Sequence, residues 1–305
     1  MFVAPTGYQA IFNPAIPYVG PINGGLKSGM SLYIQGSIPE EADSFFLNLQ
    51  CGENEDSDIA SHLNAHFDGW VVLNNCQGGE WGPEEKIDNL PFSKGSSFEV
   101  VILVKDDGYQ FQVNGQDFCM FNHRLPVDTV SNLLIGGNVS IQKISIFGGG
   151  DPGDQGDGGN LPAICGPPVF YPATPYTLVI PGGLSAKQTI LFRGLIPAGA
   201  YRFYLNLTVG SSQEVAFHFN PRVEEGEVVR NSYLQEYWGD EERDFSFNPF
   251  QEGQYCDISV RCGSQMFKVF VNGQHMCNFN HRYQDKSQID TLELGGDFQV
   301  SYVCL

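Results

Sequence analysis

An internal repeat is the feature of this sequence that most constrains its fold. Three short motifs recur about 158 residues downstream: Val113–Gln116, Phe121–Arg124 and Trp81–Gly82 recur as Val271–Gln274, Phe279–Arg282 and Trp238–Gly239. Similarity at one steady offset indicates a duplicated structural unit. A chain of 305 residues is also long enough for two domains that each bury a core. The sequence therefore predicts two copies of one domain.

The apolar residues of each copy follow the pattern of β-strands. In the runs 109–113 and 267–271, aromatic and branched residues recur at every second position, and each run leads into an Asn-Gly turn signal. Residues 97–104 and 201–209 are further strand candidates. Short alternating runs of this kind are typical of half-buried antiparallel strands. We predict an all-β chain with two homologous antiparallel β-sandwich domains of about a dozen strands each.

The composition changes between the two copies. The stretch GGGDPGDQGDGGNLPAICGPP is rich in Gly, Asp and Pro and has few residues to bury, which predicts a flexible, self-repelling linker. The expected division of the chain is a tail at 1–17, a first domain at 18–148, a linker at 149–171 and a second domain at 172–305.

Charge and apolar patterning narrow the classes of partner. The formal net charge of −19 argues against binding to nucleic acid or anionic lipid, since both need clustered Lys and Arg. No apolar run is long enough to cross a membrane. The first twenty residues lack a basic start and are interrupted by prolines, so we expect no signal-peptide core and synthesis in the cytosol.

The eight cysteines favour free thiols over a disulfide framework. Only Cys119 and Cys277 occupy equivalent places in the two copies, whereas a duplicated disulfide would repeat both partners. The spacing of Cys256 and Cys262 is poor for zinc, so we expect no metal site there. The glycosylation sequons at Asn138 and Asn206 would matter only in the secretory pathway.

A polar stretch of the second copy carries the strongest functional signal. Seven candidate binding residues gather within it: His218, Asn220, Arg222, Asn231, Trp238, Glu241 and Arg243. On a strand, the first three share one face, because residues at i, i+2 and i+4 point the same way. A core strand would be apolar, so this face is either a solvated rim or a recognition surface, and the nearby Trp favours recognition.

The motifs HFNPR, VVRN and WGDEER at these spacings resemble those of the galectins, the β-galactoside-binding lectins. Two copies joined by a linker resemble the tandem-repeat class of that family, over nearly the whole chain. The resemblance implies jelly-roll, concanavalin-like sandwiches and a cofactor-free bivalent lectin. Such a lectin binds lactose-type or N-acetyllactosamine-type glycans and crosslinks glycoproteins or glycolipids in cell adhesion. It also implies a cytoplasmic and extracellular protein that leaves cells without a leader, with self-association possible.

The residue set suits galactose on chemical grounds. The indole of Trp238 can cover the apolar C–H face of the ring while His218, Asn220 and Arg222 converge on the axial O4 hydroxyl. Asn231 and Glu241 would take O6, and Glu241 with Arg243 would extend to a second sugar. Glucose has an equatorial O4 and would leave these groups unpaired, at about 1 to 3 kcal/mol for each buried group.

The first copy has the same pattern with substitutions. Its candidate binding residues are His62, Asn64, His66, Asn74, Trp81, Glu84 and Lys86. His66 replaces Arg222, and an imidazole is shorter than a guanidinium and mostly neutral near pH 7, so it lacks the bidentate bridge to a carboxylate. Lys86 replaces the last arginine. We expect weaker, altered or pH-sensitive binding at this site.

Three alternative interpretations of these residues exist. A glycosidase would need two facing carboxyls, and Glu241 lies among arginines that make it a poor acid. His62 and His66 form a His-x-x-x-His pair without an evident third ligand, so we expect no metal. A tandem β-sandwich that binds proteins, with a vestigial first site, is the third alternative.

Overall fold

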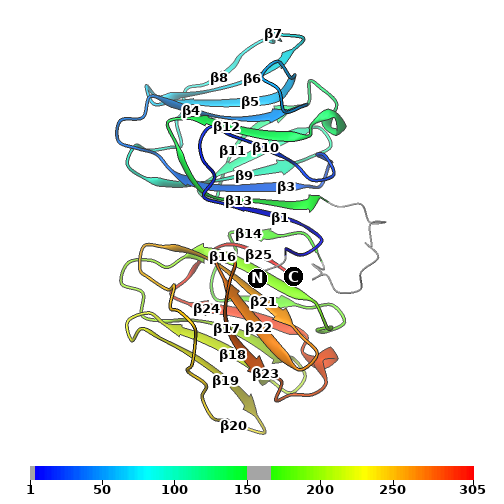
Figure 1. Cartoon of the computed structure of the whole chain (residues 1–305), viewed down its shortest axis with the longest axis vertical. Coiled ribbons are helices and arrows are strands. Elements are labelled where there is room, and N and C mark those ends of the chain that lie inside the picture. The colour runs from blue at the N-terminus through cyan, green and yellow to red at the C-terminus, as the bar shows by residue number, and fades with distance from the viewer. Residues whose placement is uncertain (1–3, 150–165) are drawn as a thin grey trace. The chain divides into compact units, whose positions relative to one another are not determined.

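The computed structural model describes residues 4–149 and 166–305. Within these segments the regular structure is β-strand except for two short 3-10 turns, Val127–Thr129 and Lys286–Gln288 (Figure 1), so the all-β prediction is confirmed. The described chain divides into two compact units: residues 6–149 form the first, and residues 166–305, with residues 4–5, form the second. No helix in these segments is long and apolar enough to cross a membrane.

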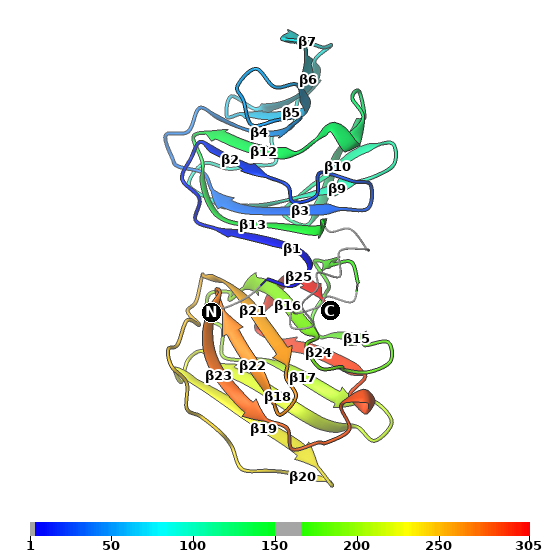
Figure 2. The ribbon, with the colours of Figure 1, turned by 45° about the vertical axis from the view of Figure 1, so that its right-hand side comes forward.

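The first unit has two antiparallel sheets, with strand orders β1-β13-β3-β9-β10-β11 and β2-β12-β4-β5-β6-β7 (Figures 1 and 2). Strand β8 pairs with β6 (Figure 1). Its strands are β1 (Gly7–Phe12), β2 (Tyr18–Pro21), β3 (Ser31–Ser37), β4 (Ser44–Gln50), β5 (Ile59–His66), β6 (Trp70–Gln77), β7 (Glu80–Trp81), β8 (Glu85–Ile87), β9 (Ser97–Val104), β10 (Gly108–Val113), β11 (Gln116–Asn122), β12 (Asn132–Gly137) and β13 (Ser140–Gly149).

The second unit repeats this arrangement, with strand orders β14-β25-β16-β21-β22-β23 and β15-β24-β17-β18-β19-β20. Its strands are β14 (Val169–Phe170), β15 (Tyr176–Val179), β16 (Thr189–Leu195), β17 (Phe203–Val209), β18 (Glu214–Arg222), β19 (Glu227–Leu234), β20 (Tyr237–Trp238), β21 (Tyr255–Cys262), β22 (Met266–Val271), β23 (Gln274–Asn280), β24 (Thr291–Gly296) and β25 (Gln299–Cys304). Thirteen and twelve described strands match the predicted dozen for each copy.

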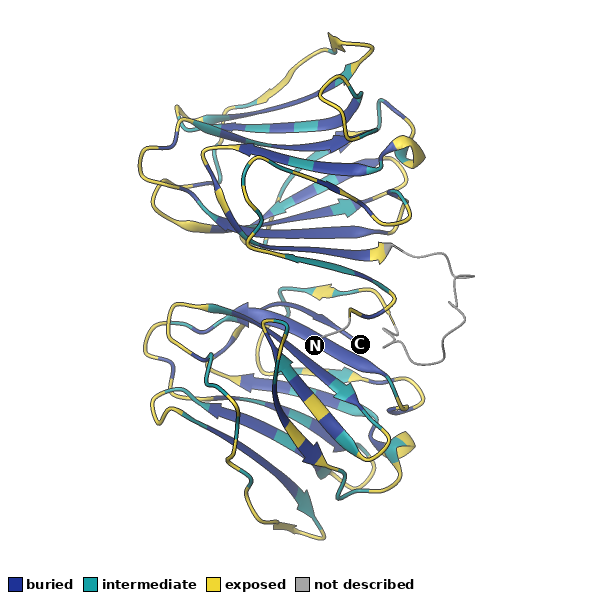
Figure 3. Cartoon of the chain, viewed as in Figure 1, coloured by how far each residue is buried: buried dark blue, intermediate teal, exposed yellow. Residues whose placement is uncertain are grey.

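Each unit buries its own apolar core between its two sheets, where the strands are coloured as buried in Figure 3. In the first unit the rings of Phe45 and Phe98 stack with centroids 5.3 Å apart, and Phe203 and Phe298 stack at 4.6 Å in the second. Burying one such ring contributes about 1.5 to 3 kcal/mol. Each sandwich is therefore stabilised by its own alternating strand residues.

The predicted Asn-Gly hairpins are present in both units. Asn114 and Gly115 connect β10 to β11 with φ values of 50° and 80°, and Asn272 and Gly273 connect β22 to β23 with 49° and 77°. A two-residue turn of type I′ needs positive φ at both central positions, which Asn and Gly tolerate best. These turns set the register of the hairpins.

Two short strands lie within the segments predicted as a tail and a linker. The segment 1–17, predicted as a tail, contains β1, which pairs with β13 at the edge of the first sandwich. The segment 149–171, predicted as a linker, ends with β14, which pairs with β25. Both short strands cover edges that would otherwise leave backbone groups unpaired. The rest of the predicted linker, residues 150–165, lies outside the described residues.

Candidate carbohydrate-binding site

A polar hollow of about 380 Å³ lies over β18 and β19 of the second unit. It is lined by Arg202, His218, Asn220, Arg222, Val229, Asn231, Trp238, Gly239 and Glu241. Six of the seven residues predicted for the second site line it, and Arg243 contacts Glu241 at its rim. The structure therefore brings the predicted set together in one place.

Strand alternation explains how β18 presents its polar face. Phe217 and Phe219 point into the core and are fully buried, while His218 and Arg222 point outward and stay half-exposed. In β19, Asn231 lies directly opposite His218 in the ladder. The predicted shared face of His218, Asn220 and Arg222 follows from this period-two pattern.

His218 is a neutral hydrogen-bonding group in the floor of the hollow. Its Nδ1 lies 2.6 Å from Asn206 Oδ1 on the neighbouring strand β17. Burial, together with the positive charges of Arg222 and Arg202, lowers the pKa of His218 to about 4, although Glu241 opposes the shift. At physiological pH one ring nitrogen therefore donates and the other accepts.

The two asparagines are held by neighbouring groups. Asn220 Nδ2 donates to the Phe203 carbonyl at 2.7 Å, and Asn231 Nδ2 donates to the Gly239 carbonyl at 2.9 Å. Asn231 Oδ1 also accepts from Arg282 Nη1 at 2.9 Å. Both amides are buried and fixed in orientation before any ligand arrives.

A charged network surrounds Glu241. Arg243 donates to Glu241 Oε2 from Nε at 2.9 Å and from Nη2 at 2.6 Å, and Arg222 Nη2 lies 3.6 Å from Glu241 Oε1. Arg243 also bonds Glu227, and Arg222 Nη1 donates to Glu225 at 3.3 Å. Glu241 thus lies between two arginines, and these contacts fix the rotamers of all three side chains.

Trp238 presents a broad apolar surface beside these polar groups. Its side chain is 50% exposed, and its ring meets the His218 ring edge-on with centroids 5.0 Å apart. Tyr233 packs against the same indole at 5.4 Å. An exposed indole next to fixed donors and acceptors suits a ligand with one apolar and one polar face.

We call the histidine, the asparagines and the indole the floor of the site, and the first unit repeats this floor. His62 Nδ1 lies 2.6 Å from Asn48 Oδ1, the His62 and Trp81 rings meet edge-on at 4.9 Å, and Trp81 is 54% exposed. Burial and the nearby His66 lower the pKa of His62 to about 4. Asn64 lies on the same strand, and Asn74 faces His62 across the ladder.

The rim of the first site is built differently. The His66 ring stacks on Trp70 at 5.4 Å, and Lys86 Nζ lies 4.6 Å from the centre of the same indole. Lys86 also pairs with Asp88 at 3.0 Å. Glu84 is exposed and has no ion pair within residues 4–149 and 166–305. The charged clamp of the second site is thus replaced by an aromatic and cationic stack.

Sequence reasoning missed several residues that support these sites. Arg282 bonds Asn231, the Asp240 carbonyl and Glu242, and Arg124 bonds Asn74, Asn75 and Glu85 in the same way. The sequence feature that could have identified these two arginines is the repeated Phe-Asn-His-Arg motif, but this motif lies far in sequence from the other site residues. Trp70 was also missed as a site residue, because its partners come from two other strands.

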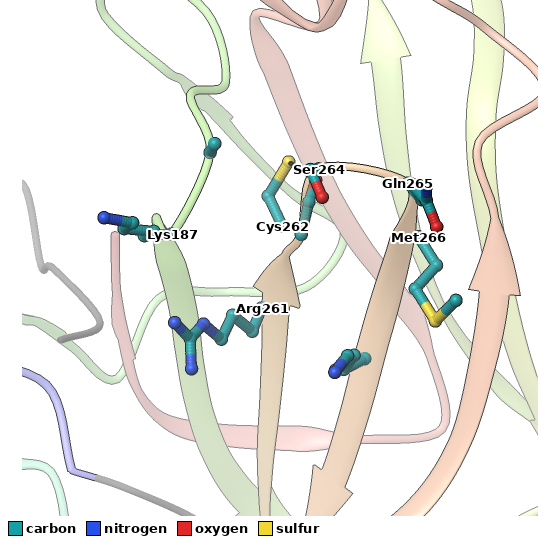
Figure 4. Close-up of a pocket in the computed structure, with 9 residues that line it drawn as sticks. Lys187, Arg261, Cys262, Ser264, Gln265 and Met266 are labelled. Atoms are coloured by element: carbon teal, nitrogen blue, oxygen red, sulfur yellow. Dashed lines mark hydrogen bonds between the residues drawn. The ribbon is translucent and has the colours of Figure 1, made fainter. Parts of the chain in front are cut away.

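The other metal-ligating and nucleophilic side chains of the described segments lie outside these two sites. Within the described segments, no three His, Cys, Asp or Glu side chains are placed to hold a metal ion. The seven cysteines described there are free, and burial raises the pKa of Cys119 to about 12 and of Cys262 and Cys277 to about 11. Another hollow, of about 420 Å³, lies at the β21–β22 turn beside Lys187 and Arg261 (Figure 4) and contains none of the predicted residues.

Comparison with known proteins matches both units. Residues 17–146 and 175–305 each match the galactoside-binding lectin family. Pig galectin-4 is 46% identical over 319 residues, human galectin-4 is 43% identical over 319 residues, and 99% of each chain is covered in both cases. Rat galectin-8 is 32% identical, with 95% of each chain covered. A solved structure of a human galectin-16 variant is 30% identical, with a TM-score of 0.43, and covers 46% of this chain and 100% of its own.

Proposed function

Because the chain belongs to the galectin family of galactoside-binding lectins, we propose that it is a bivalent lectin that binds β-galactoside glycans through one site in each domain. The observation that carries this proposal is the arrangement in the second domain. An exposed indole stands beside six polar side chains, five of which line one hollow and all of which are held by neighbouring groups.

The second site matches the two faces of a galactose ring. Trp238 would cover the C–H face, and His218, Asn220 and Arg222 would bind the axial O4 hydroxyl. Asn231 and Glu241 lie beside the indole, where they would bind O6. A sugar with an equatorial O4 would leave buried polar groups unpaired, which typically costs about 1 to 3 kcal/mol for each group.

Fixed side chains would compensate for a shallow site. The Asn220 and Asn231 amides are bonded to backbone carbonyls, and Glu241 is clamped by Arg243. Ligand binding then needs little further ordering of these groups, so more of the contact energy contributes to affinity. Both oxygens of Glu241 face guanidinium groups, an arrangement that favours hydrogen bonding to a hydroxyl over proton donation to a glycosidic oxygen.

The first site would have weaker or shifted specificity. His66 replaces Arg222, and the stack of His66, Trp70 and Lys86 stands where the second domain has the clamp around Glu241. This stack offers an apolar surface and one cation to a second sugar. The second domain offers fixed carboxylates and guanidiniums at that place. The two sites would therefore prefer galactosides that differ beyond the terminal galactose.

Crosslinking would follow from two sites on one chain. Weak single-sugar contacts gain strength when both sites engage one surface at high effective concentration. We propose that this chain bridges glycoproteins or glycolipids, supports cell adhesion, and is present both in the cytoplasm and outside the cell. Free cysteines suit synthesis in a reducing compartment.

Lactose-affinity chromatography of the full chain and of Trp81→Ala and Trp238→Ala variants tests the proposal. Each variant silences one site, so the full chain and Trp81→Ala should bind and elute with free lactose. If neither is retained, the lectin proposal is wrong. Glycan-array profiles of the two variants then test the specificity difference. Equal profiles and equal affinities would contradict it, and a silent first site would favour the vestigial alternative.

A further inference from the structure

Three residues form a hydrogen-bonded row behind the second site. His218 on β18, Asn206 on β17 and Glu293 on β24 lie directly opposite one another in the sheet register. His218 Nδ1 is 2.6 Å from Asn206 Oδ1, and Asn206 Nδ2 donates to Glu293 Oε2 at 3.1 Å. Asn206 and Glu293 are half-buried, so the row is partly shielded from water.

The row permits one assignment of donors and acceptors. A carboxylate can only accept, so the NH₂ group of Asn206 must face Glu293 and its carbonyl oxygen must face His218. His218 Nδ1 then has to donate, and the ring of a neutral histidine keeps a single proton. The other nitrogen, Nε2, is left as an acceptor on a ring that lines the hollow.

The first domain lacks the end of this row. Leu134, Asn48 and His62 occupy the same register positions on β12, β4 and β5. Asn48 Oδ1 and His62 Nδ1 are still 2.6 Å apart, but the side chain of Leu134 has no atom that can accept a hydrogen bond from Asn48. The Asn48 amide is therefore not oriented by its neighbour on β12, and His62 can face it with either ring nitrogen protonated.

We propose that Glu293 is a specificity-determining residue of the second site, which acts through Asn206 to fix His218 as a hydrogen-bond acceptor. The second site then requires a ligand hydroxyl that donates to His218, whereas the first site accommodates a donor or an acceptor. The ligand part of this inference rests on the proposed galactoside function, and the part about His218 does not.

Nitrogen-15 NMR of the sugar-free full chain tests the assignment directly. The chain has six histidines, and a His218→Gln variant identifies the signals of His218. At pH 7 we expect His218 with the proton on Nδ1, and a mixture of tautomers for His62. Glu293→Leu should give His218 the same mixture, and Leu134→Glu should give His62 a single tautomer. Glu293→Gln keeps the shape of the side chain and replaces the leucine variant if that variant folds poorly. It should shift the tautomer of His218 only partly toward the mixture.

Glu224→Gln is the matched control, since it removes an exposed carboxylate of the β18–β19 turn and should leave the His218 spectrum unchanged. A His218 with its proton on Nε2, or a tautomer insensitive to both Glu293 variants, would overturn the proposal. Both results are independent of sugar binding, so they are distinguishable from failure of the lectin proposal.

Binding of lactose and of its 4′-deoxy-4′-fluoro analogue, which is changed at the galactose O4, tests the consequence for the ligand in the Trp81→Ala background. Fluorine accepts but cannot donate, so the second site should prefer lactose by about 10-fold or more, the discrimination typical of one unpaired polar group. Glu293→Leu should lower this preference by roughly 3-fold or more. An unchanged preference in a folded, lactose-binding Glu293→Leu chain would contradict the proposed role of Glu293.

Discussion

The two sites share a floor and differ at the rim. In both domains a partly buried histidine of lowered pKa bonds an asparagine on the neighbouring strand and meets an exposed indole edge-on. The rim of the second site is a network of arginines and glutamates around Glu241, whereas the rim of the first is His66 and Lys86 around Trp70. The two copies of the domain have thus kept the arrangement around the histidine and the indole and differ in the residues at the rim.

Under the proposed function, we expect this difference to separate affinity for galactose from the choice among galactosides. The floor is tied to the sheet by strand register and by Arg282 and Arg124, which bond the asparagines of the second and first sites in equivalent ways. The rim residues depend on long side chains that are bonded mainly to one another. Substitutions in the floor should therefore affect both domains alike, and substitutions in the rim should affect them differently.

The largest effect is expected for the indoles. Trp238→Ala removes the apolar platform of the second site and should weaken lactose binding there by about 30-fold or more, as for other buried aromatic anchors. Trp81→Ala should weaken the first site by a similar factor, because both indoles meet an equivalent histidine. Titration calorimetry of each variant beside the unchanged chain measures the loss at the substituted site. A much smaller loss of lactose affinity in one domain would show that the indole of that domain does not contact the sugar.

How far the sequence predicts these features depends on the range of each interaction. The strands, the Asn-Gly turns and the shared face of His218 and Arg222 follow from local alternation, and all are present. Arg282 and Trp70 were missed because they reach the sites across strand pairings that no local pattern specifies. Short strands such as β1 were missed for a similar reason, since an edge strand is defined by its partner.

Acid should destabilise both domains, and the second one more. An unfolded histidine has a pKa near 6.5, so between about pH 6.5 and pH 4 the unfolded chain binds protons that folded His62 and His218 exclude. Stability is full above that window, and about 2 kcal/mol per histidine should be lost from pH 7 to pH 5. Burial also lowers the pKa of His281, which adds to the loss in the second domain.

Urea unfolding followed by tryptophan fluorescence measures this dependence. Trp238 reports the second domain in a chain that lacks Trp70 and Trp81, and removing Trp238 instead leaves reporters only in the first. His218→Gln should flatten the pH dependence of the second domain and leave the first unchanged. If stability did not change between pH 7 and pH 5, the neutral, buried state of these histidines would be wrong.

Exchanging the rim residues should change affinity by an intermediate amount. Arg222→His removes one partner of Glu241 and should weaken lactose binding at the second site by about 10-fold, as expected for a lost charge-assisted hydrogen bond. His66→Arg should strengthen the first site by less, because Trp70 stands where the second domain has Glu227 as a partner for Arg243. Adding Trp70→Glu and Lys86→Arg should enlarge the gain. Equal affinities in all variants would show that the rim does not contact lactose.

A smaller effect is expected at a buried arginine that only the second domain has. Arg230 is fully buried and pairs with Asp244 at 2.7 Å, while Leu73 occupies the same position in the first core. Asp244→Asn should destabilise the second domain by about 1.5 kcal/mol, because it leaves the guanidinium poorly compensated. Arg230→Leu should be neutral or stabilising, since an apolar side chain needs no partner. Urea unfolding measures both, and a strongly destabilising Arg230→Leu would contradict this reasoning.

The smallest effect is expected for the cation over Trp70. Lys86 lies 4.6 Å from the centre of the indole, is about half exposed and pairs with Asp88. Lys86→Met keeps the aliphatic contact and removes the charge, so it should change the stability of the first domain by less than about 1 kcal/mol.

The effect of Lys86→Met on binding depends on the ligand. Affinity for lactose should change less than twofold, while affinity for galactosides with an anionic group near the second sugar should fall several-fold. Glycan-array binding in the Trp238→Ala background separates these outcomes, and equal losses for neutral and anionic galactosides would show that Lys86 supports the fold of the site rather than its choice of ligand.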